Sequence, residues 1–543
     1  MRCSRSAFVL MLVVLVVGCA DEADENLTAP SEGSARSASS QGFGVVSNAE
    51  VPPGYFLVPV ARGLDFPTAV AFSSDRIWVA ESGALPGTAP RIEEIDANGE
   101  ATTILDGDAL GAQLMGPLTD VTYHDGWLWI THRQAGVNGW AVGAISKFDP
   151  EDPVGTFTTV LTNLPSAGDH YTEEVVFDGE RGYFAQGSAT NSSVVGADNW
   201  LITAWLQDFP DFHDFAPVPL VLNGAAFGTA APFPLDPSAS EMTAPYMPFA
   251  SGPVAAGTTI PAVPQEGIVA GNGAVYSFDA TASDATASLR LEAWGFRNPY
   301  GIGLDPSDPG TLYVTNNGTD TRGVAGETSV PVDEEEFMIV GSRPIDEEFD
   351  DLFRVAVGGS EEFFGWPDYF HDPESGEVLP VTDEEFCEEG ELDPCPAFVL
   401  DESFRASLNP LPAVTELGYH TSANKFDIST SDHFKHAGDL FVAYTGSFIP
   451  VTGAEEFTGY KVVRVDPGSG TVEDFIINTG TTPESLFDPD GFNKPIDVKF
   501  RGDAMLIVDF GVFEPGLGIV QAGTGKLWAV CHGAAACKAL ARD

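Results

Sequence analysis

The sequence predicts an all-β fold, a six-bladed β-propeller of four-stranded antiparallel blades. The main observation is a pattern that recurs six times: an apolar strand, a short turn containing Asp or Gly, and a second apolar strand. Its copies occupy residues 66–82, 116–133, 170–188, 298–317, 424–446 and 493–511. Each hairpin has one apolar face, and repetition around an axis buries that face against a neighbour. The 58 Gly and 40 Pro residues also suit short strands joined by turns.

The other strands of each blade are expected between the hairpins, for example at 91–105, 144–164, 274–294 and 460–477. The last apolar segment, Lys526–Val530, is too short to finish a blade by itself. The first, Tyr55–Leu64, precedes the first hairpin and lacks a partner. We expect these two segments to pair, so that the N-terminal strand closes the last blade and no sheet edge stays exposed.

Two long inserted loops interrupt the repeat, at about residues 190–271 and 346–419. Both are rich in Pro, Gly and Phe. Long loops on a rigid scaffold usually carry binding function, and decoration without a function is an equally open interpretation. Residues 51–543 are therefore expected to form one propeller domain with two insertions.

Residues 1–18 are predicted to be a signal peptide. Two arginines precede the apolar run 7–17, which is shorter than a membrane-spanning helix. The run ends in Gly18-Cys19, which resembles a bacterial lipobox, where the signal is removed and the cysteine is acylated. We expect lipidation at Cys19, a disordered tether over 19–50, and a lipoprotein on the periplasmic or cell-surface side of a bacterial membrane. An ordinary secretory signal is the alternative.

Four further cysteines occur as two close pairs, Cys387 with Cys395 and Cys531 with Cys537. Because an exported protein meets oxidising conditions, we predict a local disulfide in each pair. Zinc and haem are disfavoured, since the chain has no CxxC zinc spacing and no CxxCH sequence.

The chain is strongly acidic, with 80 Asp and Glu residues against 25 Lys and Arg and a net charge of −55. Such a charge disfavours nucleic acid and anionic lipid surfaces as partners. Any membrane contact is therefore expected through the N-terminal lipid alone. Acidic surfaces with little Lys are typical of proteins that stay soluble in salty, halophilic or marine surroundings.

Three stretches carry the most specific sequence signals. The first is Gly168-Asp169-His170, at the start of the third hairpin. The second runs from WGFRNPYG (294–301) through LYVTNNGTD (312–320) to VDEEEF (332–337), and the third is FFGWPDYF (363–370). In this order they resemble the glucose/sorbosone dehydrogenase family, six-bladed propellers that bind pyrroloquinoline quinone and calcium. The resemblance runs from about Phe66 to Ile507, without the insertions.

The resemblance implies a catalytic role for three residues. His170 matches the family's base, which removes a hydroxyl proton while hydride leaves the sugar. Asp169 would orient this imidazole and stabilise its protonated form. Arg297, followed by Asn298, matches the Arg-Asn pair that lies against the quinone, where the guanidinium can stabilise the negative charge of reduction.

The resemblance also implies calcium and further cofactor contacts. Calcium would be held by the loop Asn317-Gly318-Thr319, whose carbonyl oxygens suit a hard cation. Glu335 and Glu336 match an acidic cluster that helps to bind structural calcium. Lys494 is the one cation that the sixth hairpin offers to the quinone, and Tyr419 and His420 lie near the place of its aromatic contact. At Thr445-Gly446-Ser447 the chain departs from the family, because no Lys or Arg is present.

The sequence thus predicts an exported, lipid-anchored dehydrogenase that oxidises an aldose or a related sugar. No side chain accepts hydride, so the quinone would supply the electron sink. Without a fused haem domain, a separate electron acceptor is expected. One alternative is a non-catalytic propeller that binds glycans or protein partners. A calcium-dependent hydrolase or lactonase is the other, and the propeller fold alone does not decide among them.

Overall fold

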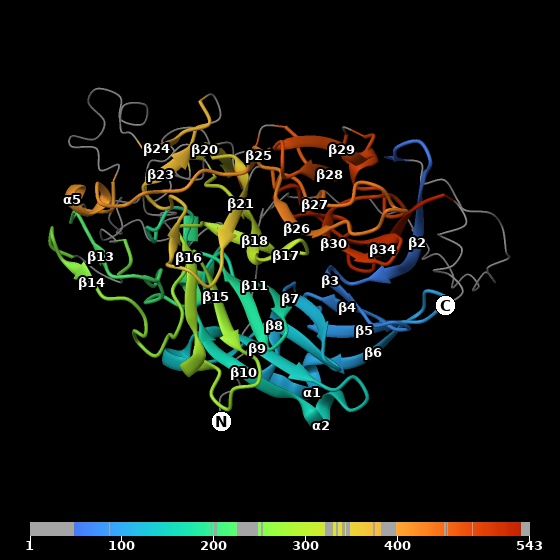
Figure 1. The fold of residues 1–543 in the computed structure, drawn as a ribbon, viewed down its shortest axis with the longest axis horizontal. Helices are drawn as coiled ribbons and strands as arrows, with labels where there is room; N and C mark the ends of the chain where they lie inside the picture. Colours follow the sequence, from blue (N-terminus) through green and yellow to red (C-terminus); the bar gives the residue numbers. More distant parts are fainter. Residues whose placement is uncertain are drawn as a thin grey trace, which may run out of the picture.

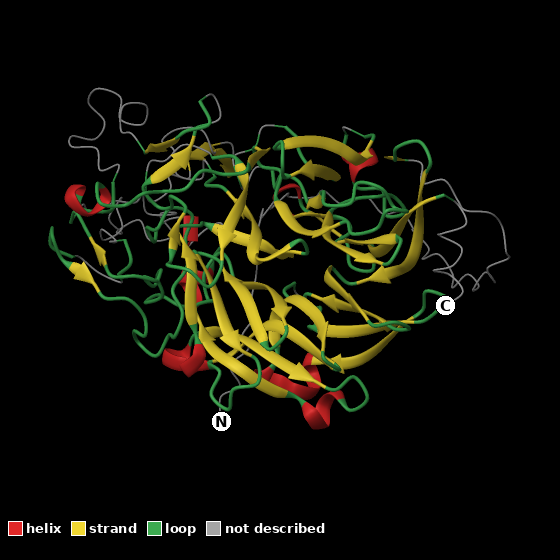
Figure 2. Cartoon of the chain, viewed as in Figure 1, coloured by secondary structure: helices red, strands yellow, loops and turns green. Residues whose placement is uncertain are grey.

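Six mostly antiparallel sheets follow one another around a centre in the computed structural model and form a β-propeller (Figure 1). Strands account for nearly all of the regular structure, and the helices are short (Figure 2). The all-β, six-bladed prediction is confirmed. The structure describes residues 48–533 except 86, 197, 200–202, 225–247, 251–253, 321–328, 333–334, 339–342, 344–347, 373–374, 382–397, 450–451, 453, 455 and 481.

The first three blades each begin with one of the recurring hairpins. The first blade consists of β3 (Pro67–Phe72), β4 (Ile77–Glu81), β5 (Arg91–Ile95) and β6 (Ala101–Asp106). The second consists of β7 (Met115–His124), β8 (Trp127–Ala135), β9 (Ala141–Phe148) and β10 (Thr158–Leu164). The third contains five strands, β11 (Thr172–Asp178), β12 (Arg181–Gln186), β15 (Ala274–Asp279), β16 (Arg290–Trp294) and β22 (Glu362–Phe363).

The last three blades complete the ring. The fourth consists of β17 (Asn298–Asp305), β18 (Asp308–Asn317), β21 (Asp350–Ala356) and β25 (Thr415–Gly418). The fifth consists of β26 (Ala423–Ile428), β27 (Leu440–Tyr444), β28 (Lys461–Asp466), β29 (Thr471–Asn478) and the short β1 (Ala49–Glu50). The sixth consists of β30 (Pro495–Arg501), β31 (Ala504–Asp509), β34 (Gly525–His532) and β2 (Tyr55–Leu64).

The ring closes as the sequence predicts. Strand β2 pairs antiparallel with β34, with Tyr55 opposite His532 and Leu64 opposite Gly525. The outermost strand of the sixth blade, β2, therefore comes from the N-terminal part of the described chain. The strand beside it, β34, comes from the C-terminal part. The first strand of each blade contacts the first strand of the next, and β30 contacts β3.

Inner strands of the sheets are buried on both faces, because every blade packs between two others. Strand β4 (IWVAE) and strand β31 (AMLIVD) are buried along their whole length. A strand buried on both faces reads as a continuous apolar run rather than an alternating one, which explains the apolar runs of the hairpins.

Charged side chains join the inner strands near the axis. Lys425 on β26 is fully buried and pairs with Asp120 on β7, with Nζ and Oδ1 2.8 Å apart. Lys499 on β30 pairs with Glu174 on β11 at 2.5 Å. The other carboxylate oxygens accept hydrogen bonds from backbone amides of neighbouring blades, as Asp120 does from Val175 and Glu174 from Ile302. Buried carboxylates thus replace the ladder bonds that inner strands of different blades do not share.

The described part of the first insertion packs onto the second and third blades. Trp205, Phe212, Phe215 and Ile268 form an apolar cluster with Trp140, which precedes β9. The second insertion is shorter than expected, because β21 and β25 within residues 346–419 belong to the fourth blade. The acidic run at the start of β21 obscured that strand in the sequence.

Small hairpins and single-turn helices lie within the loops that connect the blade strands. The hairpins are β13 (Leu220–Val221) with β14 (Thr259–Ile260), β19 (Ser329–Val332) with β20 (Glu335–Met338), β23 (Tyr369–His371) with β24 (Val378–Pro380), and β32 (Phe513–Glu514) with β33 (Ile519–Val520). The helices are α1 (Gly107–Leu110), α2 (Pro153–Thr156), α4 (Trp205–Asp208), α5 (Glu402–Arg405) and α6 (Pro483–Leu486). Among the described residues, no helix is long and apolar enough to cross a membrane.

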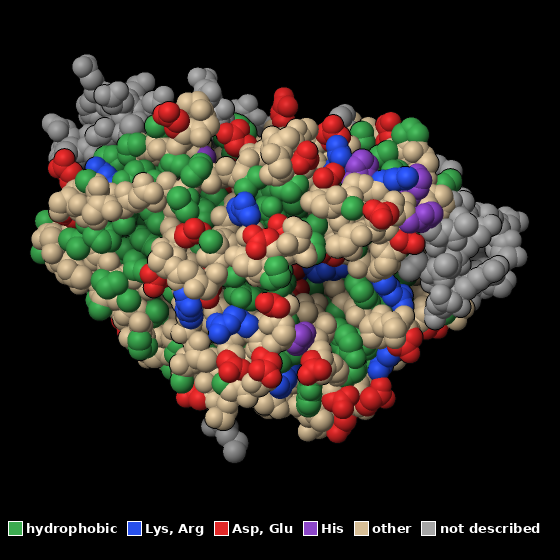
Figure 3. Space-filling view, in the orientation of Figure 1, with side chains coloured by type: hydrophobic (Ala, Val, Ile, Leu, Met, Phe, Trp, Pro, Cys, Tyr) green, Lys and Arg blue, Asp and Glu red, His purple; other side chains and the backbone are tan. Residues whose placement is uncertain are grey.

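The described surface is acidic, in keeping with the composition. Acidic side chains are scattered over the visible face, with fewer basic ones among them (Figure 3). Cys531 is buried and disulfide-bonded. The other predicted modification sites, Cys19, Cys387, Cys395 and Cys537, lie outside the described residues, as do the signal peptide and nearly all of the tether.

Candidate functional site

A cavity of about 290 Å³, here called the mouth pocket, lies where several blades bring their loops together. Its walls come from residues just before β11, at the start of β17, and just after β18, β27 and β31. The fold therefore gathers segments far apart in the sequence. Six of the predicted site residues line it: Asp169, His170, Arg297, Asn298, Asn317 and His420.

The imidazole of His170 is held by the backbone of the neighbouring strand end. Its Nδ1 lies 2.9 Å from the carbonyl oxygen of Ser188 and 3.2 Å from the Ser188 hydroxyl. Because a carbonyl oxygen only accepts hydrogen bonds, Nδ1 carries the proton in the neutral ring. Nε2 is then the basic nitrogen. The His170 side chain is partly buried and lines the mouth pocket.

Asp169 is tied to the first insertion. Its Oδ1 accepts hydrogen bonds from Trp205 Nε1 at 2.6 Å and from Asn199 Nδ2 at 3.2 Å. The group that holds the His170 ring at Nδ1 is thus Ser188. The predicted role of Asp169 in orienting His170 stays a prediction.

Arg297 and Asn298 carry polar atoms that nothing described satisfies. The Arg297 guanidinium pairs with Asp320, with Nη2 and Oδ2 2.7 Å apart. Asn298 Nδ2 donates to Asn317 Oδ1 at 2.9 Å. Arg297 Nε and Asn298 Oδ1 are both buried and have no hydrogen-bond partner among the described residues. An unsatisfied buried polar atom is costly, so a ligand that bonds these atoms would be favoured.

Asp320 is the site residue that sequence reasoning passed over. It ends the quoted run LYVTNNGTD and pairs with Arg297, and its Oδ1 lies 3.6 Å from His420 Nδ1. Its backbone exchanges two hydrogen bonds with the Asn191 side chain of the first insertion, at 2.9 and 3.1 Å. An acidic residue two positions after the Asn317-Gly318 pair was the available signal.

Asp350, at the start of β21, adds a third carboxylate to the lining. It accepts hydrogen bonds from Gly318 N, Thr421 Oγ1 and Ala423 N at 3.1, 2.7 and 2.9 Å. Burial raises the pKa of Asp350 to about 6, although these hydrogen bonds lower it. Among the described lining residues, Asp169, Asp320 and Asp350 thus face a single permanent cation, Arg297.

The backbone of the loop predicted to bind calcium is hydrogen-bonded to residues at and just before the start of β21. Gly318 N donates to Asp350, and Thr319 N donates to Glu348 Oε2 at 3.1 Å. The Thr319 carbonyl accepts from Glu348 N at 2.9 Å. In the part of the chain that is described, no group of three or more His, Cys, Asp or Glu side chains could hold a metal ion. Calcium would therefore need loop carbonyls, or oxygens of a bound molecule.

Glu335 and Glu336 lie on β20, opposite Val332 and Pro331 of β19. Their side chains lie outside what the structure describes. Their predicted role at calcium stays a prediction.

Two predicted cofactor residues do not line the mouth pocket. Lys494 is fully buried, with Nζ 3.2 Å from Glu514 Oε2 and 4.5 Å from the ring centres of Phe448 and Tyr460. Burial lowers the pKa of its ammonium group. Tyr419 stacks on Phe349, with ring centres 3.9 Å apart.

One wall of the mouth pocket is aromatic. Phe448, Phe510 and Phe513 line it, with the ring centre of Phe513 at 5.3 Å from Phe510 and 6.0 Å from Phe448. The polar wall of His170, Arg297 and Asn298 completes a cavity with an apolar side and a few convergent polar groups. This combination is typical of small-molecule sites.

The sequence matches no family model and no curated protein. Solved structures share the fold. The iodide structure of a Trichoderma reesei protein of Carbohydrate-Active Enzymes Family AA12 is 14% identical, with a TM-score of 0.51, covering 91% of this chain and 100% of that one. The calcium structure of the family AA12 protein is 13% identical, with a TM-score of 0.50, and covers 90% of this chain and 98% of that one.

The soluble aldose sugar dehydrogenase of Escherichia coli, in its apo-form, is 13% identical with a TM-score of 0.46, over 88% of this chain and 99% of that one. Likenesses at such identity concern the fold. The two structures with TM-scores of 0.50 and 0.51 therefore show a shared fold and nothing finer.

Proposed function

We propose that the protein oxidises an aldose or a related sugar in the mouth pocket, with pyrroloquinoline quinone and calcium as its resident groups. The observation that carries this proposal is the pair of unsatisfied buried atoms, Arg297 Nε and Asn298 Oδ1, in the same cavity as the His170 imidazole. The fold shared with a carbohydrate-active enzyme that has a calcium structure supports it.

His170 would act as the base. Oxidation at an anomeric carbon requires loss of the hydroxyl proton together with hydride. Because the Ser188 carbonyl keeps the proton on Nδ1, Nε2 of His170 is the nitrogen that receives the substrate proton. The resulting imidazolium keeps its hydrogen bond to Ser188, and the carboxylates of Asp169 and Asp320 in the same lining favour its positive charge.

The described lining fits the redox-active part of a quinone. Arg297 Nε–H can donate to a quinone oxygen, and Asn298 Oδ1 can accept from a substrate hydroxyl. When bound, the quinone would supply the hydride acceptor that no side chain provides. Since three lining carboxylates face one guanidinium, a tricarboxylate needs added positive charge here. Calcium, held by oxygens of the loop that includes Asn317, would supply it.

The first test is calorimetric titration of the purified protein with pyrroloquinoline quinone, with and without calcium. We expect binding in the micromolar range or tighter that depends on calcium, and Arg297→Ala should weaken it by at least about tenfold, as for loss of a charged hydrogen bond. The matched control is Arg354→Ala, because Arg354 forms an exposed pair with Asp308. No quinone binding by the wild type with calcium would contradict the proposal and favour the glycan- or protein-binding alternative.

The second test separates chemistry from binding. His170→Asn should lower the rate of sugar oxidation by about 10²–10⁴-fold, the usual contribution of a general base. Quinone affinity should stay close to that of the wild type, because His170 is assigned to the substrate proton. Unchanged turnover in this variant would remove His170 from the mechanism.

Lipid anchoring at Cys19 and electron transfer to a separate acceptor are part of the same proposal. Cys19→Ala should move the protein, expressed in a bacterium, from the membrane fraction to the soluble fraction. Continued membrane association of this variant would contradict lipidation at Cys19, and a wild type already in the soluble fraction would support the ordinary-signal alternative.

A further inference from the structure

A second cavity of about 410 Å³, here called the side pocket, lies between the second and third blades. It is lined from the β7–β8 turn, the strands β8 and β9, the β11–β12 turn and the loop after β15. The mouth pocket involves the start of β11 and the side pocket its end. The two cavities are therefore separate sites at opposite ends of the same inner strand.

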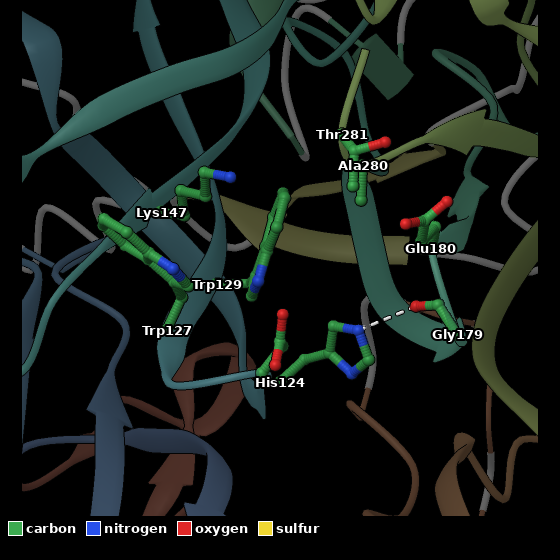
Figure 4. Close-up of a pocket in the computed structure, with 9 residues that line it drawn as sticks. His124, Trp127, Trp129, Lys147, Gly179, Glu180, Ala280 and Thr281 are labelled. Carbon is green, nitrogen blue, oxygen red and sulfur yellow. Dashed lines mark hydrogen bonds between the residues drawn. The ribbon is translucent and has the colours of Figure 1, made fainter.

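Strand register places three side chains of the second blade together. Trp127 and Trp129 are two residues apart on β8 and so point to the same face. Lys147 on β9 is the cross-strand partner of Trp129 and shares that face. Its ammonium lies 4.7 Å from the Trp129 ring centre and 5.3 Å from that of Trp127. In Figure 4 the two indoles and Lys147 form one wall, with Glu180 and Thr281 across the cavity.

The wall is rigid. The Trp129 ring centre lies 4.8 Å from that of Phe177 and 6.2 Å from that of Phe278, both from the third blade. His124 stacks flat on Phe177, with centres 4.3 Å apart and an interplanar angle of 5°. Its Nε2 lies 2.8 Å from the Gly179 carbonyl oxygen (Figure 4). The site is thus built before a ligand arrives.

Two donors in the side pocket lack acceptors. Trp129 is only 2% exposed, and its Nε1–H has no hydrogen-bond partner among the described residues. Lys147 has neither an ion pair nor a side-chain hydrogen bond within the described chain; aromatic faces alone hold its ammonium. An unsatisfied indole N–H and an ammonium without a counterion both call for oxygen acceptors, and the ammonium for an anionic one.

Two exposed carboxylates at the rim, Asp125 and Glu180, supply hydrogen-bond acceptors. A carboxylate accepts hydrogen bonds and donates none. Hydroxyl groups of a ligand would satisfy both rim carboxylates. The partly exposed Trp127 offers an apolar face for a flat patch of C–H groups. The ligand should therefore combine one anionic group, several hydroxyls and an apolar ring face.

We propose that the side pocket binds a uronic acid residue of an acidic polysaccharide. The sugar carboxylate pairs with Lys147, a sugar oxygen accepts from Trp129 Nε1, the pyranose ring packs on Trp127, and hydroxyls donate to Glu180 and Asp125. The site stands apart from sugar oxidation at the mouth pocket and would bring the enzyme to a polymeric substrate source. Its 410 Å³ lies within the size range of small-molecule sites.

Calorimetric titration of the purified full chain with a galacturonic acid trimer tests the proposal, with the neutral galactose trimer as the second probe. The buffer contains about 0.3 M salt, which screens the repulsion between the net charge of −55 and the acidic trimer. We expect the acidic trimer to bind with a Kd below about 1 mM and at least tenfold more tightly than the neutral one. Lys147→Gln and Trp127→Ala should each weaken the acidic trimer about tenfold.

Lys435→Gln is the matched control, because Lys435 is exposed on another blade and no side-chain contact of it is described. Its affinity should equal that of the wild type. Equal binding of both trimers, or full affinity in Lys147→Gln, would overturn the proposal. Thermal unfolding of each variant identifies misfolding, and retained quinone binding by Lys147→Gln separates this result from any failure at the mouth pocket.

Discussion

At His170, one backbone hydrogen bond decides which ring nitrogen is basic. The Ser188 carbonyl fixes the proton on Nδ1, so Nε2 is the basic nitrogen of the neutral ring. The Arg297 guanidinium pairs with Asp320 through Nη2, whereas its Nε–H has no hydrogen-bond acceptor among the described residues. Arg297 thus keeps one buried donor unsatisfied among the described residues, which is how a binding site differs from a core.

A contrasting histidine lies in the second blade. His132 is fully buried on β8, with Nε2 2.8 Å from Ser146 Oγ and Nδ1 2.8 Å from the Arg133 carbonyl. Burial lowers its pKa from 6.5 to about 4. Both nitrogens are used by protein, so His132 is a structural residue that stays neutral.

This depressed pKa makes a prediction about stability and pH. Above pH 6.5 the ring is neutral in both folded and unfolded states, and its contribution is complete. As the pH falls from 6.5 to 4, the unfolded chain binds a proton that the folded chain does not. The free energy of unfolding therefore falls by about 3 kcal/mol. His132→Gln should remove this part of the slope, as measured by urea unfolding at pH 4.5, 5.5 and 7. An unchanged difference between pH 4.5 and 7 would contradict the assignment.

Among the elements, the inner strands depend on buried charge. Lys425 reaches from β26 to the carbonyl of Thr119 at 2.6 Å and to Asp120 at 2.8 Å, both on β7. Strands β26 and β7 belong to the fifth and second blades, which are not neighbours in the ring. The lysine therefore spans the axis, and its loss leaves a buried carboxylate without its cation.

Lys425→Met should accordingly lower the free energy of unfolding by about 3–5 kcal/mol, the usual cost of breaking a buried ion pair from one side. Guanidinium unfolding followed by tryptophan fluorescence measures it. The matched control is Lys461→Met, because the Lys461–Asp474 pair is partly exposed, and its loss should cost less than about 1 kcal/mol. Equal costs for both variants would show that the axial pair is not needed for stability.

The hairpins and the closure by β2 and β34 could be predicted from sequence, because apolar pattern and turn residues act locally. The pairing of Lys425 with Asp120 could not, since a strand pattern specifies which face is buried but not which distant residue is opposite. The bonds from Asn199 and Trp205 to Asp169 were missed for the same reason. Six of the proposed site residues meet in one pocket because their motifs sit at strand ends, and strand ends of all blades converge.

At the scale of the whole molecule, net charge opposes folding. A charge of −55 on 543 residues repels itself most strongly in the compact state. Burial eases part of this, because it raises the pKa of Glu173 and Asp214 to about 7 and so favours their neutral forms. The remaining repulsion lies on the surface, where salt screens it.

Stability should therefore rise with ionic strength. Going from 0.01 M to 1 M salt shortens the Debye length from about 30 Å to about 3 Å, so repulsion among surface carboxylates largely disappears. We expect Tm, measured by calorimetry at pH 7.5, to increase by several degrees over this range, with most of the gain below about 0.3 M, where the screening length changes fastest. An uncharged osmolyte at matched osmolality is the control, because it leaves electrostatic screening unchanged. A Tm that follows osmolality equally in salt and osmolyte, or that falls with salt, would show that surface repulsion does not limit this propeller, and the acidic composition would then need another physical cause.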